Sequence, residues 1–353
     1  MMGKKSDKGV HCVYRGDALN NPKRNSPASG GEGARSAPTL RTVTVNDVED
    51  PKKDIPFKPG ELIGDYKLSS VLGKGSFGTV YLAQEQLLQR EVALKVCPED
   101  FYEGRTIAQL EHEGIVRVHS QKVIQGYCVI DMQYVPSITL DEVIQELKKL
   151  VTPEWNGGSW IEFLERKFPN PSLTVAQFRC REMLLKSTAS ESVALIGMQI
   201  AEALMHAHSK GILHLDIKPE NILIHSSGKP YVMDFNVSTQ KTELEQGVPT
   251  NYGGTFEYMS PEQRDVFHAN NRAEAVKKVS EASDVFSLGV VLLELLELTN
   301  LQNREAQALK SVLNKATEKE TGSRFANMHQ FYSALKGYLK LCQIKTSMPS
   351  LGP

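Results

Sequence analysis

The chain has 353 residues, of which 41 are basic and 42 acidic, and its five cysteines form no CxxC pair. The balanced charge excludes a global attraction to nucleic acid or to an anionic membrane. Because the cysteines are odd in number and scattered, they exclude a disulfide framework or a cysteine zinc site. The length suits one domain of roughly 250 to 300 residues with tails. Free thiols fit a reducing compartment, so we expect a cytoplasmic protein.

The N-terminal part differs in composition from the rest. Residues 1–57 are rich in Ser, Gly, Pro, Asn and Lys and show little apolar periodicity, so we expect a disordered tail. This tail lacks the apolar core of a signal peptide. The longest apolar stretch, Val285 to Leu298, is interrupted by Glu294 and Glu297 and is too short to span a bilayer. We therefore expect no membrane span.

A glycine-rich loop, Leu72 to Val80, lies between two strand-like runs, Tyr66 to Val71 and Val80 to Ala83. Glycines let a backbone approach phosphate groups closely. Dinucleotide-binding folds also use GxGxxG, but in those folds a helix follows the glycines. Here Thr79 to Leu82 is typical of a second strand, so the pattern favours a different kind of phosphate-binding loop.

The following strand, Val92 to Lys95, ends in a lysine. Such a lysine either extends its amine to solvent or holds a phosphate. A helix-like segment, Asp100 to Leu110, then contains Glu103, which is either a partner for Lys95 or a solvated surface charge, with Glu99 as a weaker competitor.

The remaining boundaries follow from strand and helix patterns. Cys128 to Met132 predicts the last strand of a strand-rich N-terminal lobe at 62–135, and Gln133 to Val135 predicts the connection to the rest of the chain. A helix from Thr139 to Leu150 then opens a large lobe at 136–340, within a domain at 58–340 and before a C-terminal tail at 341–353.

An inserted segment from Val151 to Thr188 contains both tryptophans, Trp155 and Trp160, and an amphipathic run from Ile161 to Phe168. A loop of this length is seldom structureless in a compact domain. One interpretation is a short helix packed on the large lobe. The other is a docking surface for a partner or substrate, and the residues leave both open.

A buried helix is predicted where apolar residues recur at helical spacing, namely at Val193, Ile196, Ile200, Ala203, Leu204 and Ala207. His206 and His208 have no partners at metal-ligand spacing, so we interpret them as ordinary helix residues.

Two polar motifs follow this helix, His214 to Asn221 (HLDIKPEN) and Met233 to Asn236 (MDFN). Their acids, lysine and asparagine suit transfer of a phosphoryl group from a magnesium nucleotide to a hydroxyl. Either acid alone would more simply belong to a polar turn after a buried strand. The ordered set, flanked by the strand-like residues Ile222 to Ile224 and by Val232, argues against that reading.

Together with the glycine loop and Lys95, these motifs resemble the eukaryotic-type (Hanks-type) serine/threonine protein kinases, whose catalytic loop reads HRDxxxxN and whose metal loop reads DFG. The sequence HLDIKPENIL, residues 214–223, is similar to that of bacterial members of the family. The resemblance implies an α+β, two-lobed fold with a small β-rich lobe, helix C and a larger helical lobe. It also implies transfer of the ATP γ-phosphoryl group to Ser or Thr hydroxyls of protein substrates, with Mg²⁺.

The resemblance assigns roles to the polar residues. Asp216 would orient the substrate hydroxyl and Lys218 would neutralise the transferring phosphate. Asn221 and Asp234 would hold magnesium. Lys95, paired with Glu103, would hold the α- and β-phosphates. The nucleotide site would consist of Leu72, Gly73, Gly75, Gly78, Val80, Ala93, Lys95, Met132, Gln133, Val135, Thr139 and Leu223.

Further residues match supporting parts of the family. Asp284 would brace the catalytic loop backbone, and Thr255 would bond toward Asp216 and Lys218, as in Ser/Thr rather than Tyr kinases. Met259 to Glu262 matches the end of the activation segment, with Arg324 as the buried partner of Glu262.

The sequence departs from the family at two positions. Leu215 replaces the arginine that couples an activation-segment phosphate to the catalytic loop, and Asn236 replaces the glycine of DFG. Asparagine tolerates left-handed torsions, and neither change removes a group needed for chemistry. The alternatives are a pseudokinase acting as an ATP-binding scaffold, and a small-molecule kinase, which the Ser260-Pro261-Glu262 segment disfavours.

Overall fold

The computed structural model describes residues 11–15, 55–75, 78–98, 110–149, 155–169, 172–235, 238–247, 249, 251–299 and 303–346. The expected partner of Lys95, Glu103, and its competitor Glu99 lie outside these ranges, as does Asn236.

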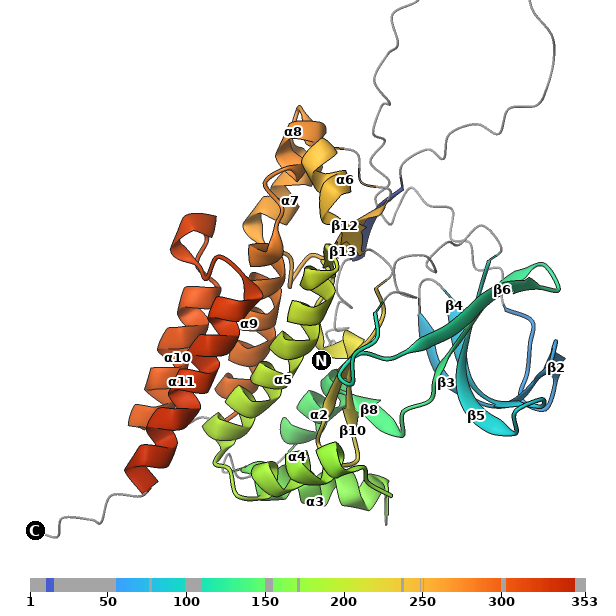
Figure 1. Ribbon diagram of the computed structural model, residues 1–353, viewed down its shortest axis with the longest axis horizontal. Coiled ribbons are helices and arrows are strands. Elements are labelled where there is room, and N and C mark those ends of the chain that lie inside the picture. The colour runs from blue at the N-terminus through green and yellow to red at the C-terminus, as the bar shows by residue number, and fades with distance from the viewer. Residues whose placement is uncertain are drawn as a thin grey trace, which may run out of the picture.

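Strands dominate the first half of the described chain and helices the second (Figure 1). The strands are β1 (His11–Arg15), β2 (Leu62–Ile63), β3 (Tyr66–Gly75), β4 (Gly78–Glu85), β5 (Arg90–Pro98), β6 (Val118–Ile124), β7 (Tyr127–Gln133), β8 (Ser137–Thr139), β9 (Ile212–Leu213), β10 (Ile222–His225), β11 (Pro230–Val232), β12 (Thr239–Gln240) and β13 (Asn251–Thr255). The helices are α2 (Leu140–Leu147), α3 (Gly157–Lys167), α4 (Val175–Leu185), α5 (Ala189–Ser209), η1 (Pro219–Asn221), α6 (Lys241–Gln246), α7 (Pro261–His268), α8 (Arg272–Val276), α9 (Glu281–Glu297), α10 (Arg304–Ala316), η2 (Thr321–Ser323) and α11 (Met328–Thr346).

The small lobe is a six-stranded antiparallel sheet in the order β2-β3-β4-β5-β7-β6. Alternating buried positions in β4 give the sheet one face toward its own apolar cluster. In β5, by contrast, six consecutive residues from Val92 to Cys97 are buried, as expected of a central strand that is covered on both faces.

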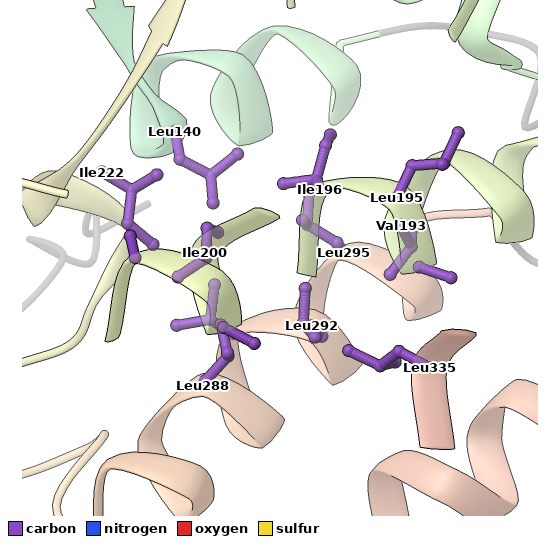
Figure 2. Packing of buried hydrophobic residues seen from close by; sticks show 14 of the residues in the cluster. Leu140, Val193, Leu195, Ile196, Ile200, Ile222, Leu288, Leu292, Leu295 and Leu335 are labelled. Atoms are coloured by element: carbon purple, nitrogen blue, oxygen red, sulfur yellow. The ribbon is translucent and has the colours of Figure 1, made fainter. Parts of the chain in front are cut away.

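The large lobe is built around α5 and α9, whose apolar residues form the main core (Figure 2). Thr188 begins α5 with a capping box, in which its hydroxyl accepts from the Glu191 amide and the Glu191 carboxylate accepts from the Thr188 amide at 2.8 Å. Gly197 lets the two helices approach closely, because a Cβ there would lie 2.4 Å from Leu292 Cδ1. This packing sets the position of the loop that follows α5.

The inserted segment is part of the large-lobe core. Trp155 is 4% exposed and Trp160 is fully buried, and both belong to the same cluster as the α5 side chains. The amide of Gln177 on α4 donates to the hydroxyl of Tyr231 on β11 at 3.0 Å, which ties the segment to the strands beside the catalytic loop. The packed-helix interpretation is therefore supported, and a docking role stays a prediction.

The expected disorder of residues 1–57 does not hold at two points. Ile55 and Phe57 pack against the apolar cluster of the small lobe, and the Phe57 carbonyl accepts from the Tyr81 hydroxyl at 2.8 Å. His11–Arg15 forms strand β1, which pairs with β13 in the large lobe. Composition alone could not reveal this strand, because its hydrogen-bonding partner lies more than 200 residues away in the sequence.

Replacing Trp160 by alanine should lower the free energy of unfolding by about 3 to 5 kcal/mol, because a large cavity would open in the core. Phe178→Ala on α4 is the matched control, since Phe178 is 54% exposed and exposed changes usually cost less than about 0.5 kcal/mol. Urea unfolding measures both. Equal small losses would show that the segment is a peripheral appendage.

Candidate active site

One buried acid holds the backbone of the catalytic loop. Asp284, near the start of α9, accepts the amide hydrogen of His214 at 2.9 Å on Oδ2 and that of Leu215 at 2.8 Å on Oδ1. The expected bracing role of Asp284 is thus confirmed. The ring of His214 continues the network, since its Nε2 lies 3.1 Å from the Met233 carbonyl and its Nδ1 accepts from the Asp216 amide at 3.2 Å. The two polar motifs are therefore linked through one histidine.

His208 completes the environment of Asp284, and sequence reasoning missed it. Its Nε2 lies 2.8 Å from Asp284 Oδ2, and its Nδ1 lies 3.6 Å from Glu281. Burial opposes the charged imidazole, but these carboxylates prevail and raise the pKa of His208 to about 9. For Asp284, burial likewise opposes ionisation, but His208 holds its pKa below the ordinary value. The signal was present in the sequence, because His208 continues the buried stripe of Ile200 and Leu204 at four-residue spacing.

The carboxylate of Asp216 is fixed through both oxygens. Thr255 Oγ1 donates to Oδ1 at 2.9 Å, and Asn221 Nδ2 donates to Oδ2 at 3.0 Å. Lys218 Nζ lies 3.4 Å from the same Oδ2 and donates to Thr255 Oγ1 at 2.8 Å. The expected contacts of Thr255 with Asp216 and Lys218 are confirmed, and they place an acid and a cation side by side at the end of β13.

Lys95 of the small lobe reaches the second motif of the large lobe. Its Nζ lies 2.9 Å from Asp234 Oδ1, and the lysine is buried. Asp234 has a left-handed backbone, with φ of 65°, which is uncommon outside glycine but less costly for aspartate than for most residues. The Met233 amide donates to the Asn221 carbonyl at 3.0 Å, so the Asn221 and Asp234 side chains arise from neighbouring backbone.

Several predicted nucleotide-site residues share one face of the small-lobe sheet. Val80 is directly opposite Lys95, Ala93 is two residues before Lys95, and Met132 is directly opposite Ala93. Since cross-strand partners and residues two apart point to the same side of a sheet, these four side chains lie together. Met132 also packs with Val135 and Leu223 in a small apolar cluster that includes Val116, Tyr231 and Met233.

The glycine loop is a β3–β4 hairpin in which the three predicted glycines differ. Gly78 has φ of 149°, and a Cβ there would lie 2.2 Å from the Val96 carbonyl oxygen, so the turn itself requires glycine. A Cβ on Gly73 or Gly75 would meet none of the residues that the structure describes within 4 Å. Packing against the described residues therefore does not require glycine at these two positions, and their place in a nucleotide site stays a prediction. Leu72 beside them is 46% exposed.

Two other predicted nucleotide contacts already have backbone or capping partners. The hydroxyl of Thr139 accepts from the Glu142 amide at 3.2 Å as the N-cap of α2, so a ribose would compete with this cap. The backbone amide of Gln133 donates to the Arg117 carbonyl at 2.8 Å. Thr139 nevertheless pairs with Leu223 between β8 and β10, which keeps it beside the apolar cluster.

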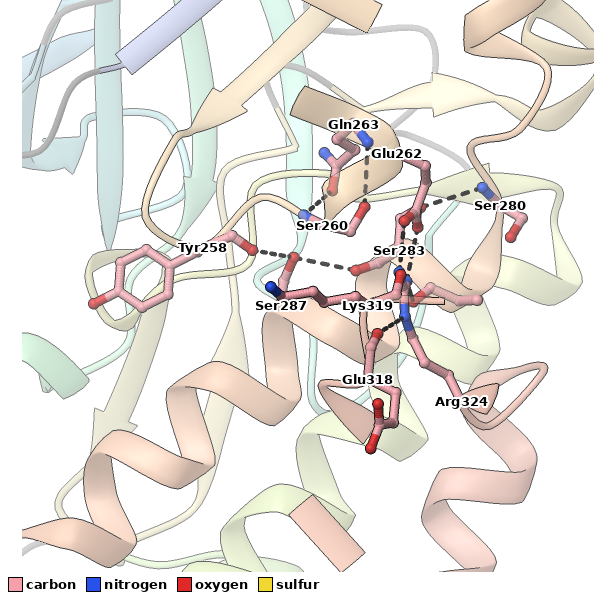
Figure 3. Close-up of polar contacts among 11 residues, drawn as sticks. Tyr258, Ser260, Glu262, Gln263, Ser280, Ser283, Ser287, Glu318, Lys319 and Arg324 are labelled. Atoms are coloured by element: carbon pink, nitrogen blue, oxygen red, sulfur yellow. Dashed lines mark hydrogen bonds and ion pairs between the residues drawn. The ribbon is translucent and has the colours of Figure 1, made fainter. Parts of the chain in front are cut away.

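The expected pair of Glu262 and Arg324 is present (Figure 3). The guanidinium donates to the two carboxylate oxygens at 2.8 and 2.6 Å, and Ser283 Oγ donates to the same carboxylate at 2.7 Å. Burial opposes the charge on Glu262, but Arg324 and Ser283 hold its pKa below the ordinary value. The ion pair fixes the start of α7, directly after the segment that carries Thr255.

Leu215 fills the position of the missing arginine with an apolar contact. It is 1% exposed and packs in a cluster with Leu213, Leu244, Tyr252, Val266, Val276 and Val279. Its φ of 62° is held by the Asp284 bond to its amide and by Gln263, whose Nε2 donates to its carbonyl at 2.9 Å. Residues of the activation segment thus contact the catalytic loop through buried apolar surface.

The raised pKa of His208 predicts how stability depends on pH. In the unfolded chain a histidine loses its proton near pH 6.5, whereas the folded protein keeps it to about 9. The folded state therefore binds more protons between these values, and the free energy of unfolding should fall as pH rises through them, by at most about 1.4 kcal/mol per pH unit.

Urea unfolding at several pH values tests this prediction. The variant His208→Asn should lose much of this fall in stability above pH 6.5, whereas His268→Asn, at an exposed position on α7, should keep it. An unchanged pH dependence in His208→Asn would mean that another group is responsible.

Comparisons with known proteins agree with this geometry. The family model described as "Protein kinase domain" matches residues 66–343. The serine/threonine-protein kinase PknE of Mycobacterium bovis is 28% identical over 250 residues, which cover 68% of this chain and 36% of that protein. The serine/threonine-protein kinase PrkC of Bacillus subtilis is 29% identical over 271 residues, covering 74% of this chain and 34% of that protein.

The chain thus spans about a third of the length of these relatives. A crystal structure of the Mycobacterium tuberculosis PknI kinase domain, a double mutant, aligns with a TM-score of 0.51 at 21% identity and covers 80% of this chain and 99% of that one, which shows the fold. Among the helices that the structure describes, none has both the length and the apolar character to cross a membrane. The chain belongs to the protein kinase family, with the α+β, two-lobed fold of that family.

Proposed function

We propose that this chain is an ATP-dependent protein kinase that transfers the γ-phosphoryl group to Ser or Thr hydroxyls of protein substrates, with Mg²⁺. The observation that carries the proposal is the linked set of Asp216, Thr255 and Lys218, joined by contacts of 2.8 to 3.4 Å. A hydroxyl placed beside this set meets a proton acceptor and a cation for the transferring phosphoryl group, which are the two groups such a transfer needs.

The proposed reaction has a simple balance. The substrate oxygen forms a bond to the γ-phosphorus, the bond from that phosphorus to the β–γ bridging oxygen breaks, and ADP leaves. The hydroxyl proton passes to the carboxylate of Asp216. Because Asn221 and Thr255 fix both carboxylate oxygens, the acid is oriented before the substrate arrives, which is the positioning that phosphoryl transfer depends on.

The oxygen donors fit a hard divalent ion. The Asn221 amide nitrogen makes its bonds to Asp216 at 2.8 and 3.0 Å, so the amide oxygen is directed elsewhere and is the atom that a metal would take. Asp234 supplies a carboxylate nearby. One amide oxygen and one carboxylate suit Mg²⁺, which is usually held by few protein ligands and completes its shell with water and substrate phosphates. When bound, Mg²⁺ would neutralise charge on the phosphates.

Specificity for Ser or Thr is supported by Lys218 and its bond to Thr255, and by the printed names of the relatives, which are serine/threonine-protein kinases. A cytoplasmic location is part of the proposal. It is supported by the sequence, whose five scattered cysteines form no CxxC pair, as is usual for proteins of a reducing compartment.

The variant Asp216→Asn tests the proposed role of the acid. It should lower kcat for a serine-containing acceptor peptide by about 100- to 10,000-fold and leave the Kd for ATP nearly unchanged, because Asp216 faces the hydroxyl and not the adenine side. Asp265→Asn, at an exposed position on α7, is the matched control and should keep wild-type turnover. If wild-type protein binds ATP but transfers nothing, the scaffold alternative is favoured.

Activity should not require a phosphate on the activation segment, because the site where an arginine would read it is occupied by Leu215 in an apolar cluster. Of the candidate acceptors in this segment, Ser238 and Thr239 are themselves buried, Thr242 is exposed and Thr250 lies outside the described residues. Enzyme treated with phosphatase should keep most of its rate toward an added peptide. A collapse that is reversed by phosphorylation at one of these sites would contradict the prediction.

A further inference from the structure

The N-terminal strand β1 lies along the activation segment. It pairs antiparallel with β13, so that His11 is opposite Thr255, Cys12 opposite Gly254, Val13 opposite Gly253, Tyr14 opposite Tyr252 and Arg15 opposite Asn251. In Figure 1 the dark blue strand β1 runs beside β13 of the large lobe, although the two strands are far apart in the sequence. Within the described residues these two strands form a sheet of their own.

This pairing brings β1 to the reacting groups. Thr255, the last residue of β13, donates to Asp216 at 2.9 Å and accepts from Lys218 at 2.8 Å. Paired residues in an antiparallel sheet have Cα atoms about 4.5 to 5.5 Å apart. The backbone of His11 therefore lies one strand spacing from Thr255, whose hydroxyl donates to Asp216.

Contacts with the catalytic loop and with α7 fix the position of β13, so another strand can pair with it. A Cβ on Gly254 would lie 2.7 Å from the Leu215 carbonyl oxygen, which shows how closely β13 approaches the catalytic loop. The hydroxyl of Tyr252 donates to the Gln263 carbonyl at 3.1 Å, and its ring is 2% exposed. A fixed strand whose backbone edge pairs with another strand, as β13 pairs with β1, is the arrangement that binds extended peptides by strand addition.

We propose that β13 is the docking strand for the acceptor peptide and that β1 of the same chain occupies it, so that the N-terminal segment restrains the kinase. This proposal rests on the proposed function. The paired stretch, HCVYR, contains no Ser or Thr, so it fills the site without offering a hydroxyl of the proposed substrate class. Its tyrosine is opposite Tyr252, three residues or about 10 Å from the Thr255 end.

The connection to the small lobe makes occupation within one chain favourable. The 39 residues at positions 16 to 54 join β1 to the described part of the small lobe. Their sequence is rich in Gly, Ser and Pro. Because β1 and β13 belong to one chain, their pairing is intramolecular, and an effective concentration replaces the bulk concentration of a separate peptide. A short strand that would bind weakly as a separate peptide can therefore compete with substrates.

Proline substitution tests the proposal in the full-length chain. Antiparallel pairing uses the amides of alternate residues, so the double variant Cys12→Pro with Val13→Pro removes a pairing amide whichever register is used. The control is Gly30→Pro with Gly31→Pro, in the same tail but outside β1. The measurements are KM for a serine-containing acceptor peptide, KM for ATP, and hydrogen exchange of the amides of residues 251–255.

The β1 variant should show a lower KM for the acceptor peptide, by about threefold or more if β1 occupies the site most of the time. KM for ATP should not change, and exchange at residues 251–255 should become faster. A synthetic peptide of residues 9–17 should raise the KM of this variant for the acceptor again, without affecting KM for ATP. The glycine-to-proline control should behave as wild type.

Other outcomes would overturn the proposal. Faster exchange at 251–255 with an unchanged acceptor KM would mean that β1 pairs with β13 without masking a substrate site. A KM for the acceptor peptide that rises with enzyme concentration would mean that β1 of a second copy pairs with β13 instead. If no variant transfers phosphate although exchange reports the release of β1, the proposed function fails together with the masking role, while the strand pairing alone stands.

Discussion

The arrangement of the site depends on one fully buried carboxylate. Asp284 accepts the amides of His214 and Leu215, and these two bonds set the path of the backbone that presents Asp216. A carboxylate in this position needs compensation, because burying a charge without partners is costly. His208 supplies it from α5, so the two central helices of the large lobe are joined at the point where the catalytic loop begins. Core packing and site geometry are therefore coupled.

Around Asp284, polar contacts connect the lobes and the activation segment, whereas apolar contacts pack that segment against the catalytic loop. The contact of Lys95 with Asp234 connects the small lobe to the second motif, and the Glu262–Arg324 pair fixes the end of the activation segment. Between them, Leu215 packs with Tyr252 and Leu244 in place of an ionic contact. An apolar contact does not depend on phosphorylation, so the segment can keep its position without a phosphate. In the restraint proposed above, strand β1 on β13 would control the enzyme instead.

Local patterns and the resemblance to the protein kinases together predicted most of the fold and site. The β10 and β11 strands were expected from their apolar runs. The catalytic loop, the Thr255 contacts and the Glu262–Arg324 pair, whose members lie 62 residues apart, were expected from the resemblance. His208 was missed, since its partner lies 76 residues further along the chain. The two tryptophans could not be assigned, because an amphipathic helix looks the same whether a core or a partner covers it. Strand β1 was missed because strand formation depends on a distant template.

The most direct test of the central claim is turnover by Asp284→Asn, compared with Asp265→Asn. Asparagine keeps the shape and one acceptor oxygen, but it loses the charge that pairs with His208 and the second bond to the loop. If Asp284 positions Asp216, kcat for the acceptor peptide should fall by about 100-fold or more, because small displacements of reacting groups have effects of that size, while ATP binding and cooperative unfolding persist. Turnover close to that of the control in a folded variant would contradict the account.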